Sequence, residues 1–489
     1  MSHLSTLPEL QAHYGERFRW LLLLSVMIGT MASIMSSTII NVAIPGMSHH
    51  FVLGQDRAQW VSSGFMVAMT VSMLTTPWAL GRYGYRQTYV ATMLLLLAGG
   101  VVGGLANNFS LVLAGRVAEG LAAGVVQPIP AIIIMRAFAP HEQGRASGLF
   151  GMGVVLAPAL GPSIGGVLVD LCGWRSIFFM VVPFCILSIW MAYKYVPTNA
   201  PGGGLAGREA APLDWRGLLL AAGGTLCLLN GMVELQGSNR GQAMALLVAA
   251  AAIFAGFAWW QRRQAAGGGS PLLNLALFAY RPFAMGSVVA FIYGTALFGS
   301  TYLLPVYLQL GLNLSASHVG TILLPAGLVL AITIAGVGRL ADRRPTWLLV
   351  STGLACLATS FALMGTLTLT SSLWLLVALS ILGRVGLGFI LPSLNLGSLR
   401  PLPTHLLSQG SSVIGFVRTL GGAIGVSLCG IVLEWRLGVH GDSPSNPLSS
   451  PARLAAFNES FFMLAGLCAL ALLAARQLRE PARPFAKAG

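Results

Sequence analysis

The sequence predicts an all-α polytopic membrane protein, built as two six-helix bundles with two further helices inserted between them. Three observations support this fold class: an apolar composition, a series of apolar runs of spanning length, and a basic loop that occurs twice. Hydrophobic residues make up 55% of the 489 residues and charged residues only 9%, whereas a soluble domain carries about 25% charged residues. Most of the chain is therefore expected to lie in lipid or against helices that do.

Apolar runs long enough to cross a bilayer as a helix, about 20 residues each, occur along the whole chain. Fourteen such spans are predicted, near 19–45, 58–80, 88–107, 109–135, 146–170, 176–196, 216–236, 243–261, 282–311, 317–338, 346–367, 372–397, 409–434 and 458–475. The first run follows a polar, charged start and lacks a small-residue cleavage signal. It is therefore expected to stay as a helix.

The basic residues are distributed unequally between the two sides of the predicted membrane. An even number of spans puts 20 of the 28 Lys and Arg residues in loops on the side of the termini, 5 on the opposite side and 3 at membrane depth. This asymmetry predicts that both termini are cytoplasmic. The net charge of +14 then reflects basic loops that face anionic lipid, and no nucleic-acid partner is expected.

The sequence carries no signature of catalysis, metal binding or nucleotide binding. The six cysteines have no ligand-like spacing and most fall inside apolar runs, so neither a metal site nor a disulfide framework is expected. No Gly-x-x-x-x-Gly-Lys-[Ser/Thr] segment occurs, which excludes a built-in ATPase of that type. The chain is predicted not to be an enzyme and to need no cofactor, so uphill work must draw on an ion gradient.

A short basic turn follows the second span and recurs after the tenth. The first copy contains Arg82, Gly84 and Arg86, and the second contains Asp342 and Arg343. We interpret both as cytoplasmic gate loops, because an Asp and several Arg residues at facing helix ends can form a charge lock that opens in one state. The alternative is a pair of ordinary basic loops on the cytoplasmic side.

Two Gly-rich stretches, at 201–204 and 267–269, enclose the seventh and eighth spans. Linkers of this composition are flexible. The chain is therefore divided into an N-terminal six-helix bundle at 1–200, an inserted helix pair at 201–269 and a C-terminal six-helix bundle at 270–489.

The segment 153–166 combines small and helix-breaking residues within one apolar span. In water, Gly and Pro in a helix cost about 1 and about 3 kcal/mol relative to Ala, but in a bilayer neighbouring helices satisfy the freed backbone groups. A bendable helix with a flat packing face is expected, which makes this segment the predicted hinge between two moving bundles. The hinge residues are Gly153, Pro158, Gly161, Pro162, Gly165 and Gly166.

Seven segments, in order along the chain, resemble the major facilitator superfamily, and within it the fourteen-span drug:proton antiporters of the EmrB/QacA type. They lie at 38–45, 116–120 and 140–146, at the antiporter motif ending in 161–166, and at 173–179, 302–305 and 418–422. The resemblance implies export of lipophilic or amphipathic drugs, or related small molecules, in exchange for protons. It also implies alternating access around a central cavity in the plasma (bacterial inner) membrane. A periplasmic adaptor is the one protein partner that it suggests, with a monomer as the alternative.

The sequence departs from this family where an acid is usual. Ser36 occupies the place of the first-span acid and Gly81 the place of an Asp in the first gate loop. Glu119, one turn from Arg116 in the fourth span, is the predicted replacement for proton coupling, since its affinity for a proton changes when a neighbouring charge moves. The alternative is a permanent ion pair with a structural role. Glu234 is a second candidate, with simple solvation at the membrane surface as its alternative.

Polar and aromatic side chains within the spans are candidates for the substrate cavity, with hydrogen bonding between helices as the alternative. The candidates are Asn41, Gln127, Tyr302, Gln309, Asn395 and Arg418, followed by Asn230, Tyr293 and Tyr307. A lone cation at membrane depth, such as Arg418 or Arg384, is expected to face the bundle interior. Snorkelling or pairing with helix carbonyls is the alternative for Arg384. The scarcity of acids argues against strongly dicationic substrates and leaves neutral, zwitterionic and anionic lipophiles open.

Two functions of other classes also fit the sequence. One is an uncoupled facilitator or importer of a small metabolite, which the missing first-span acid permits. The other is a receptor, or a partner-dependent export channel, on the same fold.

Overall fold

The part of the chain that the computed structural model describes is helical and contains no strand. It comprises residues 6–53, 55–199, 212–235, 240–314, 316–442 and 450–479. The first half contains α1 (Leu7–Tyr14), α2 (Phe18–Phe51), α3 (Gln55–Ser72), α4 (Thr76–Leu105), α5 (Phe109–Val126), α6 (Ile129–Ala137), α7 (Gln143–Cys172), α8 (Ser176–Phe179) and α9 (Val181–Tyr195). The inserted pair is α10 (Trp215–Glu234) and α11 (Arg240–Ala266). The second half contains α12 (Arg281–Val306), α13 (Ala316–Leu340), α14 (Thr346–Met364), α15 (Leu373–Leu399), α16 (Leu407–Val439) and α17 (Pro451–Ala475). Short helical turns join them at η1 (Gly15–Arg17), η2 (Met73–Thr75), η3 (Leu275–Ala279), η4 (Tyr307–Gly311) and η5 (Thr404–Leu406).

Among the described residues, 12 helical stretches are long and apolar enough to cross a membrane, rather than the fourteen predicted. One stretch, Trp60–Leu105, has 46 residues and covers two of the predicted spans. The stretch joins α3 to α4 through η2, and within α4 the helix is broken at Gly84, whose φ of 76° is non-helical. The predicted 146–170 span corresponds to α7, a continuous helix that is not among the 12. The fold class is confirmed, whereas the count of fourteen stays a prediction.

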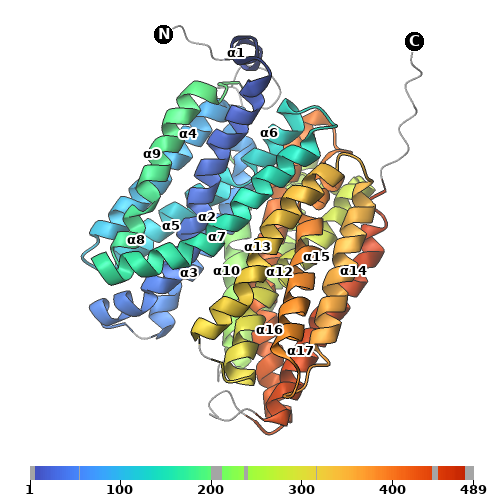
Figure 1. Cartoon of the computed structure of the whole chain (residues 1–489). Coiled ribbons are helices and arrows are strands. Elements are labelled where there is room, and N and C mark those ends of the chain that lie inside the picture. The colour runs from blue at the N-terminus through green and yellow to red at the C-terminus, as the bar shows by residue number, and fades with distance from the viewer. Residues whose placement is uncertain are drawn as a thin grey trace.

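The two halves are bundles of similar construction (Figure 1). In the first, α5 packs against α3 and α4, and in the second, α15 packs against α13 and α14. Glycines allow the closest approaches: a Cβ on Gly99 of α4 would lie 2.7 Å from the carbonyl oxygen of Gly115 on α5. A Cβ on Gly353 of α14 would lie 2.7 Å from the carbonyl oxygen of Gly386 on α15. Small residues at both crossings let the backbones touch, which is how helices associate within a membrane.

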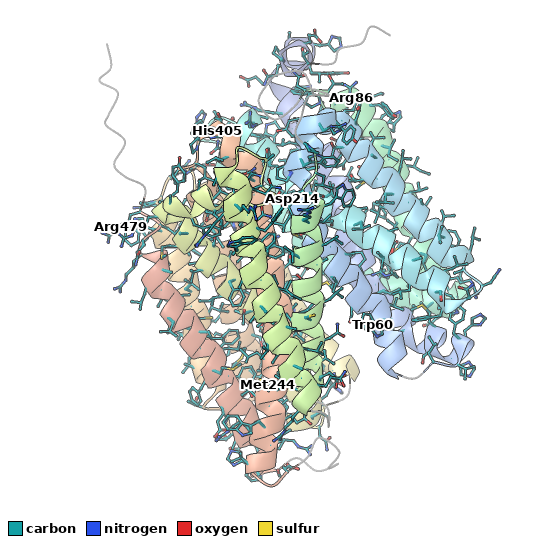
Figure 2. All side chains as sticks on the ribbon, turned by 180° about the vertical axis from the view of Figure 1, so that it is seen from behind. Trp60, Arg86, Asp214, Met244, His405 and Arg479 are labelled. Carbon is teal, nitrogen blue, oxygen red and sulfur yellow. The ribbon has the colours of Figure 1, made fainter. Side chains whose placement is uncertain are left out.

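The inserted pair is a helical hairpin that lies along the boundary between the halves (Figure 2). α10 packs against α11, and it also contacts α3 of the first half and α16 of the second. Asp214 accepts hydrogen bonds from the Gly217 backbone at 2.9 Å, from Trp260 Nε1 at 2.9 Å and from Gln261 Nε2 at 2.8 Å. This carboxylate therefore caps α10 and ties it to α11. The limits of the three domains stay a prediction, because the linker at 201–204 lies outside the described residues.

Basic residues from the predicted cytoplasmic loops gather at one end of the molecule, which we call the gate-loop end. Arg86, His405 and Arg479 lie at this end, whereas Trp60 and Met244 lie toward the other (Figure 2). The short helix α1 is at the gate-loop end as well (Figure 1). This placement agrees with an even number of crossings, and the assignment of the gate-loop end to the cytoplasm stays a prediction.

The halves meet most closely where α7 crosses α13. A Cβ on Gly148 of α7 would lie 2.7 Å from the Cα of Gly338 on α13, so this crossing needs glycine on both helices. The ribbons of the two halves diverge toward the opposite end (Figure 1). The structure is therefore closed between the halves at the gate-loop end.

The predicted hinge segment lies further along the same helix and faces the other way. A Cβ on Gly153 would approach the Met27 sulfur at 2.9 Å, and one on Gly161 would approach the Thr38 hydroxyl at 2.9 Å. Gly165 likewise faces Ile39. The motif glycines thus pack against α2 of their own half, while the first turns of α7 contact the other half. Gly166 has open space around it, Pro158 is half-buried, and the Pro162 side chain is outside the described set. The hinge role stays a prediction.

Candidate functional site

Arg116 and Glu119 form an ion pair inside the first bundle. Both side chains are only 1% exposed, and Arg116 Nη1 lies 2.5 Å from Glu119 Oε2. The same nitrogen donates to the Ser36 hydroxyl at 2.8 Å, and Nε donates to the Val61 carbonyl oxygen at 3.3 Å. The guanidinium carbon lies 4.3 Å from the centre of the Phe65 ring. The cation at membrane depth is therefore compensated by a carboxylate, by the Ser36 hydroxyl, by the carbonyl oxygens of Ser36 and Val61, and by an aromatic face.

Ser36 lies between the two charged groups, although it cannot ionise. Its hydroxyl accepts from Arg116 and is also within hydrogen-bonding reach of the Glu119 carboxylate. Room for that carboxylate comes from two glycines of α4: a Cβ on Gly99 would lie 2.8 Å from Glu119 Cγ, and one on Gly100 3.4 Å from Oε1. Position 36 and Glu119 therefore adjoin the same guanidinium. The sequence did not indicate the contributions of Phe65, Gly99 or Gly100, since each is an ordinary residue of an apolar span.

Three of the predicted substrate residues come together at the boundary between the halves. Gln127, Asn395 and Arg418 line two adjoining cavities of about 60 and 40 Å³. Phe150 of α7 is part of both walls, so α7, α15 and α16 each contribute a side chain. Thr30, Ile34, Ser147, Gly151, Val154 and Leu391 complete the larger cavity. A space of this size holds water rather than a drug-sized molecule, as expected for a central site closed at one end.

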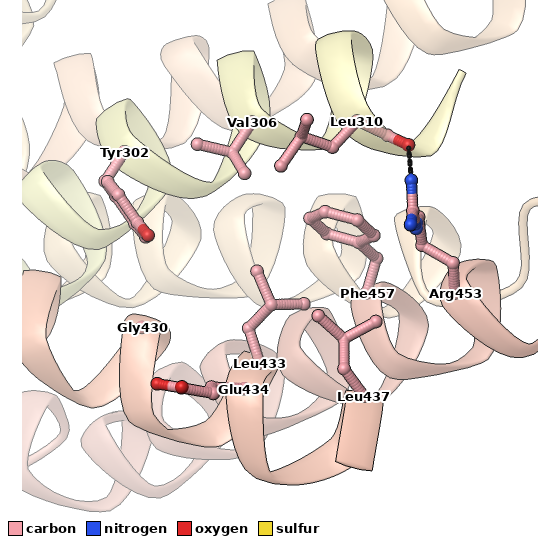
Figure 3. A pocket seen from close by; sticks show the side chains of 9 residues that line it. All are labelled: Tyr302, Val306, Leu310, Gly430, Leu433, Glu434, Leu437, Arg453 and Phe457. Carbon is pink, nitrogen blue, oxygen red and sulfur yellow. Dashed lines mark hydrogen bonds between the residues drawn. The ribbon is translucent and has the colours of Figure 1, made fainter. Parts of the chain in front are cut away.

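Tyr302 lies apart from this cavity. It lines a separate pocket of about 180 Å³ within the second bundle, between α12, α16 and α17 (Figure 3). The walls are mostly apolar, with the Glu434 carboxylate on one side and Arg453, which donates to the Leu310 carbonyl oxygen at 3.1 Å, at one end (Figure 3). The structure therefore separates Tyr302 from Gln127, Asn395 and Arg418.

The remaining candidates take varied positions. Gln309 is exposed on η4, and the side chain of Asn41 lies outside the described set. Asn230 donates to the Leu226 carbonyl oxygen of its own helix at 2.8 Å. Tyr307 packs edge-on against Phe457 and Phe461, which favours a packing role. Glu234 is the last residue of α10, half-buried, and is separate from the pair on α5.

The second gate loop joins the halves through Asp342. Its carboxylate accepts from the backbone N–H groups of Gly144 at 2.6 Å and Arg145 at 2.8 Å, at the start of α7. A carboxylate is favourable at a helix N-terminus, where free N–H groups and the helix dipole are positive. Burial raises the pKa of Asp342 above its ordinary value, and these hydrogen bonds together with the Arg400 charge act in the opposite direction.

Arg400, which the sequence did not single out, strengthens the same contact. It donates to Gln143 Oε1 at 3.1 Å and to the Pro140 carbonyl oxygen at 2.9 Å, and it lies 3.8 Å from Asp342. Arg343, the predicted cation of the lock, is exposed instead. The contact between the halves thus consists of a carboxylate on backbone amides and an arginine from the end of α15, and its role as a lock stays a prediction.

The contacts described for the first gate loop lie within its own half. Arg86 Nε donates to the Val196 carbonyl oxygen at 2.7 Å, and the Arg86 backbone N–H donates to the Pro197 carbonyl oxygen at 3.0 Å. Gly84 has a φ of 76°, and a Cβ there would collide with the Thr198 carbonyl oxygen, so glycine is required. Arg82 lies over the Tyr83 ring. This loop therefore fastens the end of α9 to α4.

Comparison with known proteins agrees with this architecture. Residues 26–426 match the Major Facilitator Superfamily. The chain is 27% identical to the multidrug export protein EmrB of Haemophilus influenzae, covering 88% of this chain and 84% of EmrB. It is 25% identical to the riboflavin transporter RibZ of Clostridioides difficile, covering 93% of this chain and 96% of RibZ. Among solved structures, the proton:xylose symporter XylE is similar in fold, with a TM-score of 0.66 over 94% of this chain and 95% of that one, at 12% identity. Because the family match spans most of the chain and multidrug exporters are among its relatives, the protein belongs to the major facilitator superfamily of membrane transporters.

Proposed function

We propose that this transporter exports lipophilic or amphipathic small molecules in exchange for protons, with Glu119 as the proton-carrying group. The observation that carries the proposal is the contact of Glu119 and Ser36 with one guanidinium, that of Arg116. In the family that the sequence resembles, an acid is usual at position 36. Here the carboxylate that adjoins the buried arginine belongs to α5 instead.

Proton uptake changes the charge of this site. With Glu119 ionised, the pair is neutral overall; with Glu119 protonated, Arg116 keeps its bonds to Ser36 and Val61 but loses its counter-charge. An uncompensated charge in an apolar interior costs several kcal/mol, enough to shift the balance between two conformations. Protonation therefore favours a rearrangement that gives Arg116 new partners or water.

α2 connects this site to the central cavity. Ser36 contacts the ion pair, while Ile34 and Thr30 line the larger cavity. Thr30 lies six residues before Ser36, or about 9 Å along the helix axis. A shift of α2 on protonation is thus transmitted to the substrate site, and α2 also carries the residues against which the motif glycines of α7 pack.

The test uses purified protein in liposomes with an imposed pH gradient. We expect Glu119→Gln to lose uphill export, by about tenfold or more for a group that binds the coupling proton. The double variant Ser36→Asp with Glu119→Gln is expected to regain part of it, because the new carboxylate adjoins the same guanidinium. Glu459→Gln is the matched control, since Glu459 is also paired with an arginine, Arg436, but within the second bundle. Unchanged pH-dependent transport by Glu119→Gln rejects the proposal.

A second candidate function is uncoupled transport of a small metabolite. The observation in its favour is that both members of the ion pair are almost fully buried, as a permanent structural pair would be. The similarity to a riboflavin transporter points the same way. Substrate counterflow in liposomes without a pH gradient, combined with no proton movement on substrate addition, distinguishes this function from antiport.

The proposal also places the protein in the bacterial inner membrane with its termini and gate loops in the cytoplasm, because basic loops stay on that side and face anionic lipid. A periplasmic adaptor stays a prediction from the family resemblance.

A further inference from the structure

Two arginines at membrane depth in the second bundle lack the compensation that Arg116 has. Arg384 of α15 and Arg418 of α16 are partly buried. Within the described part of the chain, neither forms an ion pair or a hydrogen bond. Both guanidinium groups lie within electrostatic reach of the Tyr293 side chain of α12, which is 2% exposed. Three helices therefore bring two cations and a phenol together with no carboxylate beside them.

An arrangement of this kind is costly without a counter-ion. A charged side chain within a membrane is normally paired, because an unpaired charge there is costly. The third arginine at membrane depth, Arg116, has Glu119 beside it, and the buried Arg453 near the start of α17 has Asp442. The missing negative charge is therefore specific to Arg384 and Arg418.

The place of Arg418 shows where a counter-ion can enter. Arg418 lines both central cavities, next to the Gln127 and Asn395 amides. The rest of the wall is largely apolar, with Phe150, Ile34 and Val154 among its members. A ligand matching these walls has an anionic head that accepts hydrogen bonds from guanidinium and amide groups, and an apolar body.

We propose that the central site binds lipophilic organic anions, with the carboxylate or sulfonate of the substrate held by Arg418 and Arg384 and supported by the Tyr293 hydroxyl. This inference rests on the proposed export function and assigns its substrate class. The first bundle then supplies the proton site and the second bundle the substrate site. Inorganic anions and anionic lipid headgroups share the same head chemistry, so the experiment separates them.

The experiment measures equilibrium binding to the full-length protein in nanodiscs of zwitterionic lipid, with no pH gradient. Three probes share one aromatic body: naphthalene-1-sulfonate, neutral naphthalene-1-sulfonamide and cationic 1-naphthylmethylammonium. We expect the sulfonate to bind about tenfold or more tightly than either of the others, because only it forms charge-assisted hydrogen bonds with the arginines. Equal affinity for the three probes, or tighter binding of the cation, overturns the proposal.

Variants locate the site. Arg418→Gln and Arg384→Gln are each expected to weaken sulfonate binding by about tenfold, whereas Arg418→Lys, which keeps a charge without the forked donors, weakens it less. Arg262→Gln, an exposed cation on α11, is the control that leaves binding unchanged. Unaltered sulfonate affinity in the Arg384→Gln, Arg418→Gln double variant overturns the proposal. The thermal-unfolding midpoint without ligand shows whether each variant is folded, and a variant whose midpoint equals or exceeds that of the wild type enters the comparison.

Two further comparisons complete the experiment. The first tests whether inorganic anions or anionic lipid occupy the site, and the second separates this proposal from the proposed export function. If chloride at the same concentration, or addition of anionic lipid, displaces the sulfonate completely, the site takes any anion and the assignment to organic anions is overturned. Sulfonate binding and proton-driven transport are therefore measured separately on the wild-type protein. Proton-driven transport without sulfonate binding thus rejects the substrate class alone, and sulfonate binding with proton-independent transport rejects the coupling role alone.

Discussion

The two bundles of this transporter treat arginines at membrane depth in opposite ways. In the first bundle, Arg116 is paired with Glu119, bonded to Ser36 and packed over the Phe65 ring. In the second, Arg384 and Arg418 share Tyr293 as a neighbour and have no carboxylate partner among the described residues. Similar helix packing therefore holds a self-compensated charge on one side of the central cavity and an uncompensated charge on the other. We propose that the first bundle provides its own counter-ion and that the second leaves it to a ligand.

The gate loops differ between the halves in a parallel way. Arg86 and its backbone are bonded to the end of α9, inside the first half. Asp342 is bonded to the start of α7, across the boundary between the halves. The first loop has Gly81 at the place where the second loop has Asp342. It therefore offers no carboxylate at that place to the free N–H groups of the other half. Of the described contacts, those of the second loop therefore connect the two halves at the gate-loop end.

The largest expected effect comes from breaking the compensated charge. Arg116→Gln leaves the Glu119 carboxylate buried without its partner, and breaking a buried pair in this way costs about 3–5 kcal/mol. Arg418→Gln instead removes a charge that has no partner, so the protein without ligand is expected to be as stable as the wild type or more stable. Thermal unfolding in one detergent measures both variants. Equal losses of stability would remove the contrast between the two bundles.

The double variant Arg116→Gln with Glu119→Gln sharpens this comparison. Since it leaves no unpaired charge, its unfolding midpoint is expected to fall by less than the sum of the two single changes. Additive losses mean that the two residues act independently, contrary to the contact between them.

Much of the fold could be predicted because a bilayer imposes simple rules. Helices must be about 20 apolar residues long, and charged residues within them are rare enough to be noticed. For the same reason Arg116, Glu119 and Arg418 were identified from the sequence. Gln127 and Asn395 were found as polar residues in apolar spans, and the structure places both beside Arg418.

Other features leave no mark on the sequence. The partners of Asp342 are backbone N–H groups, which every residue except proline possesses, so no residue type announces them. The bond from Asp214 to Trp260 spans 46 positions and depends on how α10 and α11 pack. Tyr302 looked like a cavity residue because of its polarity, yet its helix face turns it into a separate pocket of the second bundle (Figure 3).

A smaller effect is expected from widening the crossing of α7 and α13. Valine at Gly338 would press on the backbone of Gly148, and such overpacking costs about 1–3 kcal/mol. We expect Gly338→Val to favour opening at the gate-loop end, measured as a longer distance between spin labels at positions 87 and 344 in a background without the exposed Cys172. Gly336→Val is the matched control on the same helix, since a Cβ there has open space around it. An unchanged distance in Gly338→Val shows that this crossing does not hold the halves together.

The smallest expected effect concerns the pH dependence of the second gate loop. The pKa of Asp342 is raised in the closed structure because burial outweighs the two amide hydrogen bonds and the charges of Arg400 and His141. The closed form therefore binds a proton more tightly than an opened form in which the carboxyl is solvated. The stabilisation of the closed form by the proton on Asp342 is complete below the ordinary Asp pKa, about 3.9. It is lost as the pH rises through the raised pKa of Asp342.

The closed fraction, followed with the same spin labels, should accordingly fall as the pH rises through that window. Asp342→Asn should flatten this dependence, because it removes the titrating group while keeping a carbonyl oxygen for one amide. Because the charge of the nearby His141 also acts on Asp342, the variant His141→Gln separates the contribution of the histidine. A pH response that persists in Asp342→Asn and disappears in His141→Gln assigns the effect to the histidine. In that case Asp342 acts only as a fixed acceptor at the start of α7, and the asymmetry between the gate loops is one of geometry rather than of proton binding.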